Sequence, residues 1–445
     1  MIRKNVGMIS LGCPKNQVDA EAMLAKLEKG GYTIVSDIED SDVIIVNTCG
    51  FIDDAKREAI DTILEMGEYK KVGIISAIVV TGCLAERYQD EILKEMPEVD
   101  AVVGIGANSD IVKICDKALC GITTSVFPNK CFLSIDDERK LSTPSHWAYL
   151  KIAEGCDNRC SYCAIPGIRG KFRSRKIESI LDEAKLLADK GVKELILVAQ
   201  DTTKYGQDIY GEYSLDKLLK QLVKIDGIEW IRLFYCYPER ITDSLIDEIA
   251  KEDKICKYID IPLQHSNSTV LKNMNRAGDG DSYRKLISKM RNRIPDLALR
   301  TTFMVGFPGE TDEQFTDLCC FVDEVQFDKM GCFAFSPEED TLAFDMDCQI
   351  DENVKKRRQE VLMNNQYTIT ENLNKKRIGR IYKVIIDEYA DDKYMGRSYM
   401  DSPEIDSGII FTSKSKHNIG DFVYVKITDY DGYDLIGVVS DEFTE

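Results

Sequence analysis

The sequence predicts an α/β protein with three domains: a doubly wound parallel sheet, a partial (βα)6 barrel and a small antiparallel β-barrel. Short apolar runs alternate with amphipathic stretches over residues 1–140. A strand-then-helix rhythm repeats about six times over residues 141–373, and the pattern changes to short strands over residues 374–445. These three successive patterns set the expected order of the domains and their boundaries.

The first domain contains three apolar runs that we expect to be strands, at residues 6–12, 43–48 and 78–82. Helical periodicity covers residues 17–29 and 53–68 between them. Parallel neighbours need a crossover connection, which is usually a helix. This β-α-β-α-β order therefore indicates a parallel, doubly wound sheet.

Each of these three strands is followed at once by a cysteine, Cys13, Cys49 or Cys83. The intervals are 36 and 34 residues, one βα unit each. Open α/β sheets bind ligands at the carboxyl ends of their strands, so we expect the three thiols to converge there. We interpret them as three ligands of a 4Fe-4S cluster with one free iron. The alternative is three buried cysteines that act as small hydrophobic residues.

The second domain has the rhythm of a right-handed βα series. Such a series implies a barrel, here a partial one, whose functional residues follow the carboxyl ends of the strands. Strands are expected at residues 147–152, 194–198, 230–234, 258–261, 299–305 and 332–335, with helices near 177–190, 214–225, 242–251, 281–293 and 311–325.

A C-x3-C-x2-C run follows the first of these strands and contains Cys156, Cys160 and Cys163. Three thiolates at this spacing can hold one face of a 4Fe-4S cluster and leave the fourth iron open to a small molecule. The alternative is a structural zinc site, which needs four closed ligands. His146 is the only nearby histidine, and no fourth cysteine follows at the spacing of a zinc ribbon. The pattern therefore favours the cluster.

The composition indicates which cellular compartment and which kinds of partner to expect. Fifteen cysteines, without an apolar leader, favour thiolate ligands and free thiols over a disulfide framework. No stretch of 18 apolar residues occurs, so we expect a cytoplasmic protein with no membrane partner. The formal charge of −19 either attracts basic partners or serves solubility alone.

The third domain follows a long polar helix expected at about residues 351–374. Its last 71 residues carry ten Lys and Arg against fourteen Asp and Glu. A domain that binds the phosphate backbone of a nucleic acid usually has a net positive charge, so this net negative charge is the wrong sign for such binding. Gly and Asp turns between short strands indicate a small antiparallel barrel. The strands are expected at residues 380–386, 408–411, 422–427 and 435–439.

These features together resemble a known family. The Cys156–Cys163 segment resembles the radical S-adenosylmethionine enzymes, and the C-terminal region resembles the TRAM domain. In its order of domains the whole chain resembles the methylthiotransferases. The segments 10–21, 200–206 and 261–265 are similar to the branch that modifies an aspartate of small-subunit ribosomal protein twelve. The branch that modifies tRNA adenosine usually has Gln-Met where this chain has Pro14-Lys15.

The resemblance implies two 4Fe-4S clusters and S-adenosylmethionine as cofactors, a reducing electron donor, and a basic ribosomal protein as substrate. It makes Cys156, Cys160 and Cys163 the ligands of the radical-generating cluster. It makes the other trio the ligands of an auxiliary cluster that carries the sulfur to be inserted. One S-adenosylmethionine supplies the methyl group and another the radical that takes hydrogen from the aspartate β-carbon. No side chain is expected to be catalytic, and the resemblance assigns S-adenosylmethionine contacts to Gln200, Thr202, Gln264 and Gly306.

Two alternatives stay open on the sequence. The first is a tRNA methylthiotransferase, the only interpretation in which nucleic acid is the partner. The second is a two-cluster electron carrier, which would need neither a six-fold βα series nor a recognition barrel. The favoured mechanism requires that the two cysteine trios face each other across one cavity.

Overall fold

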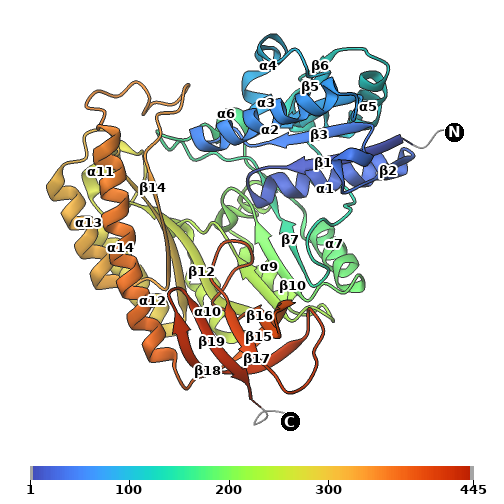
Figure 1. Ribbon diagram of the computed structural model, residues 1–445. Helices are drawn as coiled ribbons and strands as arrows, with labels where there is room; N and C mark the ends of the chain where they lie inside the picture. The colour runs from blue at the N-terminus through green and yellow to red at the C-terminus, as the bar shows by residue number, and fades with distance from the viewer. Residues whose placement is uncertain (1–3, 441–445) are drawn as a thin grey trace.

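The computed structural model describes residues 4–440, apart from the side chain of Phe132 (Figure 1). The N-terminal domain is a six-stranded sheet in the order β2-β1-β3-β4-β5-β6, and all neighbours are parallel. Its strands are β1 Lys4–Ser10, β2 Tyr32–Ile34, β3 Val43–Thr48, β4 Ala77–Gly82, β5 Ala101–Val103 and β6 Thr124–Val126. Its helices are α1 Pro14–Lys29, α2 Asp53–Lys71, α3 Cys83–Tyr88, α4 Asp90–Glu95 and α5 Ile111–Leu119.

Helices cover both faces of this sheet. Met23 of α1 and Ile114 of α5 lie in one buried apolar cluster with strand residues. Ile63 of α2 and Ile92 of α4 lie in a second cluster on the opposite face. Because both faces are buried, β3 and β4 consist of buried residues throughout, as the continuous apolar runs indicated. The predicted doubly wound sheet is confirmed.

The central domain is a six-stranded parallel sheet in the order β14-β13-β12-β11-β10-β7, and β7 and β14 are its two edges. The predicted partial barrel is thus confirmed. Its strands are β7 Trp147–Lys151, β10 Glu194–Val198, β11 Trp230–Leu233, β12 Ile255–Gln264, β13 Ala298–Val305 and β14 Lys329–Ala334. Its helices are α7 Ile177–Asp189, α8 Gln207–Tyr210, α9 Leu215–Leu222, α10 Asp243–Lys251, α11 Ser268–Asn273, α12 Gly280–Arg293 and α13 Asp312–Val325. A two-stranded ribbon of β8 Ala153–Glu154 and β9 Arg173–Ser174 encloses α6 Ile165–Arg169.

The C-terminal domain is a closed five-stranded barrel in the order β15-β16-β17-β19-β18. Two details differ from the sequence prediction. The β17–β19 pair is parallel, because β18 lies between these strands in the chain and β19 returns beside β17. The strand β16 was missed, because its KYMGR sequence has charged ends and a glycine. The elements are α14 Glu352–Arg377, β15 Ile381–Ala390, β16 Lys393–Arg397, β17 Ile409–Thr412, β18 Phe422–Asp431 and β19 Asp434–Val439.

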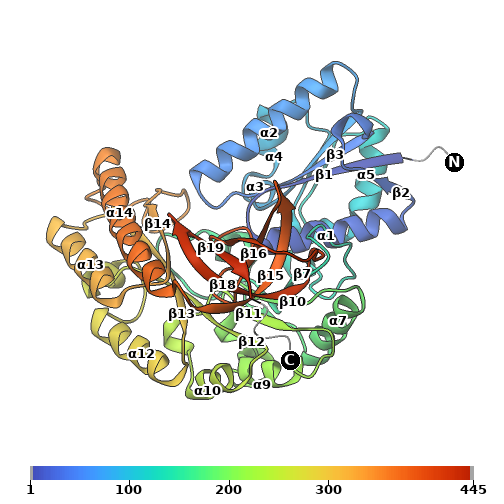
Figure 2. The same cartoon turned by 60° about the horizontal axis from the view of Figure 1, so that its bottom comes forward.

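The central sheet packs against different partners on its two faces. Successive side chains of a strand point to opposite faces. Leu195 and Leu197 of β10 lie in the apolar cluster beneath the outer helices, whereas Ile196 and Val198 lie in a cluster with residues of the C-terminal barrel. Figure 2 shows the helices as an outer arc with the C-terminal barrel inside it. The C-terminal barrel therefore fills the hollow of the partial barrel.

The N-terminal and C-terminal domains lie at opposite ends of the central strands (Figure 1). At the beginning of β11, Trp230 contacts Phe422 of the C-terminal barrel with ring centroids 4.9 Å apart. Just beyond its end, the Tyr235 ring centroid lies 3.5 Å from the Lys15 ammonium of α1. The N-terminal domain thus covers the carboxyl ends of the strands, where barrel enzymes carry their functional residues. Among residues 4–440, no helix is both long and apolar enough to span a bilayer.

Candidate active site

The three cysteines of the N-terminal domain follow neighbouring strands. Cys13 precedes the first residue of α1, Cys49 comes directly after β3, and Cys83 is the first residue of α3. Since β1, β3 and β4 are adjacent in the sheet, all three lie at one edge. This is the edge that faces the central domain.

Two of the loops that carry these cysteines lie close to each other. A Cβ atom added to Gly12 would lie 2.6 Å from Cys49 Cβ and 3.0 Å from Cys49 Sγ, so the β1–α1 loop passes Cys49 only because residue 12 is glycine. Burial, together with the neighbouring Cys83 and Cys13, raises the pKa of the Cys49 thiol to about 12. A trio of crowded thiolates fits a cationic iron cluster, which would relieve their repulsion.

The second trio lies in the loop between β8 and α6. The backbone NH of Cys156 donates to the carbonyl of Gly170 at 3.0 Å, and that of Cys163 donates to the carbonyl of Cys160 at 3.1 Å. All three thiols are free. Burial raises the pKa of Cys156 to about 11, with a further contribution from Cys160. This trio also fits a cluster rather than isolated core cysteines.

A single-ion site is not present in the described part of the chain. No group of three or more His, Cys, Asp or Glu side chains in residues 4–440 lies close enough to hold one metal ion. A 4Fe-4S cluster binds each thiolate through a different iron, so its ligands need not converge on one point. His146, the one histidine considered for zinc, is buried, and its Nε2 lies 2.7 Å from Asp387 Oδ1 of the C-terminal barrel.

A cavity of about 480 Å³ lies between the N-terminal domain and the C-x3-C-x2-C loop. Cys160 and Cys163 line one side of it, and Glu86 and Arg87 of α3 line another. Cys83 packs against Ala164 and Ile168, which also line this cavity. One cysteine of the N-terminal trio thus lies next to this cavity, while Cys13, Cys49 and Cys156 are not among its lining residues. The remaining lining residues are Gln89, Lys130, Arg159, Ser161, Pro166, Gly167, Asp340, Thr341 and Leu342.

A buried group of charges joins the two domains beside this cavity. Asp19 of α1 accepts from Lys151 Nζ at 2.5 Å and from Arg169 Nη1 at 2.5 Å. Glu154 lies 3.0 Å from the same lysine and 3.4 Å from the same guanidinium. All four side chains are almost fully buried. Burial tends to raise the pKa of Glu154, but the charges of Lys151 and Arg169 outweigh it, and the pKa falls to about 2.

The residues expected to contact S-adenosylmethionine lie at the carboxyl ends of the strands, but none of the four is among the described residues that line the cavity. Gln200 donates to Glu154 Oε1 at 2.7 Å, and its own oxygen is buried without a partner in the described chain. Thr202 is buried and donates to the carbonyl of Phe234 at 2.6 Å. Gln264 and Gly306 have positive φ angles of 70° and 73°. Their contacts with S-adenosylmethionine stay a prediction.

Several residues near the trios were not recognised from the sequence. The Tyr237 hydroxyl lies 3.9 Å from Cys160 Sγ, and the Arg276 guanidinium lies 4.6 Å from the Tyr237 ring centroid. Arg169 follows Cys163 by six positions, but its partners Asp19 and Cys83 are in another domain. The sequence carries no signal for this contact, because the partner Cys83 is 86 residues away.

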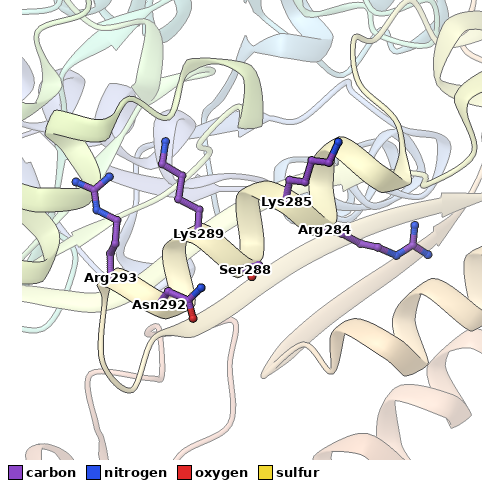
Figure 3. A pocket seen from close by; sticks show the side chains of 6 residues that line it. All are labelled: Arg284, Lys285, Ser288, Lys289, Asn292 and Arg293. Carbon is purple, nitrogen blue, oxygen red and sulfur yellow. The ribbon is translucent and has the colours of Figure 1, made fainter.

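A second hollow lies on the outside of the barrel along α12 and is lined by basic side chains (Figure 3). Three of the four cations, Arg284, Lys289 and Arg293, already have acidic partners. Lys289 and Arg293 both pair with Asp243, and Arg284 pairs with Glu324 at 2.7 Å. The stronger candidate for the functional site is therefore the cavity beside the C-x3-C-x2-C loop and not the hollow at α12.

Comparison with protein families agrees with this site. Residues 150–322 match the radical SAM superfamily, and residues 378–439 match the TRAM domain. Residues 5–104 match an uncharacterised family, UPF0004. An open parallel barrel that carries a C-x3-C-x2-C loop after its first strand, with this family match, defines a radical S-adenosylmethionine enzyme.

Relatives that align with nearly the whole chain show which family of radical S-adenosylmethionine enzymes it belongs to. The chain is 51% identical over 435 residues to the ribosomal protein uS12 methylthiotransferase RimO of Thermoanaerobacter sp. strain X514, covering 98% of this chain and 99% of that one. It is 50% identical to the RimO protein of Clostridioides difficile strain 630, with 98% of each chain covered, and 48% identical to that of Clostridium tetani, with 99% of each covered. The chain belongs to the RimO family of radical S-adenosylmethionine methylthiotransferases.

Solved structures share the fold at low identity. The methyltransferase TsrM of Kitasatospora setae matches with a TM-score of 0.56 and 14% identity, over 74% of this chain and 72% of that one. The cobalamin-dependent radical enzyme OxsB matches with a TM-score of 0.50 and 12% identity, over 83% of this chain and 58% of that one.

Proposed function

We propose that this enzyme adds a methylthio group to the β-carbon of an aspartate in ribosomal protein uS12. The observation that carries the proposal is the cavity at the carboxyl end of the barrel, which Cys160 and Cys163 line and beside which Cys83 packs against Ala164 and Ile168. All six thiols of the two trios are free. The names of the full-length relatives support uS12 as the substrate.

In this reaction the residues of the protein hold the clusters and orient the reactants. Cys156, Cys160 and Cys163 would hold the radical-generating 4Fe-4S cluster, and Cys13, Cys49 and Cys83 a second, auxiliary one. When bound, these clusters and S-adenosylmethionine supply the radical, the methyl group and the sulfur. An unactivated C–H bond offers no acid–base route, so the residues around the cavity act by positioning the reactants and excluding water.

Glu154 has a positioning role in this proposal. Its carboxylate accepts from Gln200 at 2.7 Å and from the backbone NH of Gly155 at 3.0 Å, directly before the first cysteine of the loop. Lys151 and Arg169 hold the same carboxylate from the other side. The carboxylate thereby fixes the beginning of the cluster loop relative to the strand end at which S-adenosylmethionine is expected.

The acidic charge of the chain supports a basic protein substrate. The net charge of −19, and the excess of fourteen acidic over ten basic residues in the C-terminal domain, favour encounter with a basic ribosomal protein and disfavour tRNA. We further propose a cytoplasmic location, a separate reducing electron donor, and the division of the chain into residues 1–140, 141–373 and 374–445.

Mass spectrometry tests the choice of substrate. The reconstituted enzyme is incubated with S-adenosylmethionine, a reductant and either recombinant uS12 or tRNA. A mass gain of one methylthio group on the aspartate of uS12, with no change in tRNA, is expected. Methylthiolated adenosine in the tRNA with unchanged uS12 would replace this proposal with the tRNA alternative.

A further inference from the structure

One buried hydrogen bond connects the radical domain to a cysteine of the auxiliary trio. Arg169 ends the short helix α6, which follows Cys163. Its Nη2 lies 3.3 Å from the sulfur of Cys83, across the boundary between the two domains. The Arg169 residue is only 1% exposed, and Cys83 is only 5% exposed. Water therefore competes little for this contact, and the low local dielectric strengthens it.

The guanidinium is fixed in place by other contacts. Nη1 donates to Asp19 Oδ2 at 2.5 Å and lies 3.4 Å from Glu154 Oε2, while Nη2 also donates to Asn16 Oδ1 at 3.1 Å. Arginine offers a planar fork of donors, so these acceptors set the direction of the N–H bond that points at Cys83. The charges also balance, because Lys151 and Arg169 offset Asp19 and Glu154.

A donor aimed at a cysteine ligand has a known physical effect. Hydrogen bonds to the sulfurs of an iron–sulfur cluster stabilise its more negative, reduced form and are among the factors that set its reduction potential. Burial enhances the effect because the cluster then responds to fixed protein dipoles rather than to water.

We propose that Arg169 is a positioning residue for the auxiliary cluster: it donates from the radical domain to Cys83 and raises the reduction potential of the auxiliary cluster above that of a cluster lacking this bond. Because Arg169 ends the short helix that follows the C-x3-C-x2-C loop, the bond also fixes one trio relative to the other. This inference rests on the proposed function, since it requires that Cys13, Cys49 and Cys83 hold a cluster.

The test uses the full chain with Cys156, Cys160 and Cys163 replaced by alanine, so that only the auxiliary cluster contributes a signal. After anoxic reconstitution, a redox titration followed by electron paramagnetic resonance gives its midpoint potential. Arg169→Lys keeps the positive charge but loses the forked donor, and a shift to a more negative potential is expected. The matched control is Arg175→Lys, another buried arginine, whose side chain bonds to Asp136, Glu183 and the Lys151 carbonyl. This control should leave the potential unchanged.

A second measurement needs no substitution at Arg169 and covers the case in which that variant does not fold. In the same background, arginine labelled with ¹⁵N in the guanidinium should give a ¹⁵N hyperfine coupling to the reduced cluster. No coupling, or equal potentials for Arg169→Lys and its parent, would overturn the inference. A background protein that binds no iron would instead contradict the proposed function, so the two failures are distinguishable.

Discussion

At the scale of single residues, the boundary between the first two domains depends on buried charges. Asp19, Lys151, Glu154 and Arg169 lie together with almost no exposure. Such a group is stable only while its charges balance, because the removal of one partner leaves another charge buried and unpaired. The first two predictions concern individual side chains at this boundary.

The stability contributed by Glu154 should depend on pH. The pKa of this carboxyl is lowered from 4.5 to about 2 in the folded chain. A lowered folded-state pKa stabilises the protein above the unfolded-state pKa, and this stabilisation is lost as the pH falls through the folded value. We expect the difference in unfolding free energy between wild type and Glu154→Gln, measured in urea, to be largest at neutral pH and to shrink from about pH 4.5 towards 2. A difference that is independent of pH would contradict this.

Cys49→Ala should separate S-adenosylmethionine cleavage from methylthiolation. It removes a ligand of the auxiliary trio and leaves the C-x3-C-x2-C loop intact, so S-adenosylmethionine cleavage should persist while methylthiolation is lost. The two products are measured by chromatography and mass spectrometry. Cys120→Ala is the control, since this thiol is free and exposed. Methylthiolated product from the Cys49 variant at the control's level would show that Cys49 has no such role.

At the scale of elements, the C-terminal barrel is fixed to the central sheet by buried ion pairs. Glu194 of β10 is fully buried, 2.8 Å from Arg232 of β11 and 2.6 Å from Arg397 of β16. Glu194→Gln leaves the buried Arg232 guanidinium without a carboxylate partner, while Arg397 keeps its pair with Asp387 at 2.8 Å, so we expect a loss of about 3–5 kcal/mol in urea unfolding. The control is Glu229→Gln. Its pair with Lys383 at 2.9 Å also joins the two domains but is partly exposed, and its loss should cost about 0–1 kcal/mol. Equal losses for both variants would contradict the assigned role of Glu194.

The regular elements were predictable because each has a local signal. The apolar run at residues 194–198 coincides with β10, and the helix expected near 177–190 is α7, Ile177–Asp189. In α1 the helix begins at Pro14, earlier than expected at residue 17, because proline fits the first turn of a helix. The short β2, β5 and β6 were not predicted, since three residues give too little period to detect.

Cys13, Cys49 and Cys83 could be grouped from the sequence because the chain repeats a βα unit before each of them. Arg169 could not be assigned, because its hydrogen-bond partner Cys83 is 86 residues away and belongs to another domain. The docking of the C-terminal barrel inside the partial barrel was equally invisible. Residues such as Ile196 and Val198 are apolar whether they face a helix or another domain.

At the scale of the whole molecule, a second contact closes the N-terminal domain over the barrel. Glu338, in the segment after β14, accepts from Lys56 at 2.9 Å and from Arg87 at 2.8 Å, and only 2% of its side chain is exposed. Arg87 lines the cavity, and residues 340–342 of the same segment complete its rim. These three side chains therefore join the segment after β14 to the N-terminal domain beside the cavity.

Glu338→Gln should loosen this closure. Arg87 loses its carboxylate partner and Lys56 keeps only Asp53. Hydrogen–deuterium exchange is therefore expected to rise in α3 and in residues 336–341, and methylthiolation to fall more than S-adenosylmethionine cleavage. Lys113→Ala is the control, because this side chain is exposed and pairs only locally with Asp110 at 3.0 Å. Unchanged exchange at the rim in the Glu338 variant would rule out the contact as a closure.

The most direct measurement is the iron content of the chain after anoxic reconstitution, with one trio replaced by alanine at a time. Two independent 4Fe-4S sites predict about eight irons in the wild type and about four in each triple variant, with the Mössbauer spectrum of an intact cluster in both. Replacement of Cys13, Cys49 and Cys83 with no loss of iron would show that the N-terminal trio holds no cluster, and would contradict the account of this site.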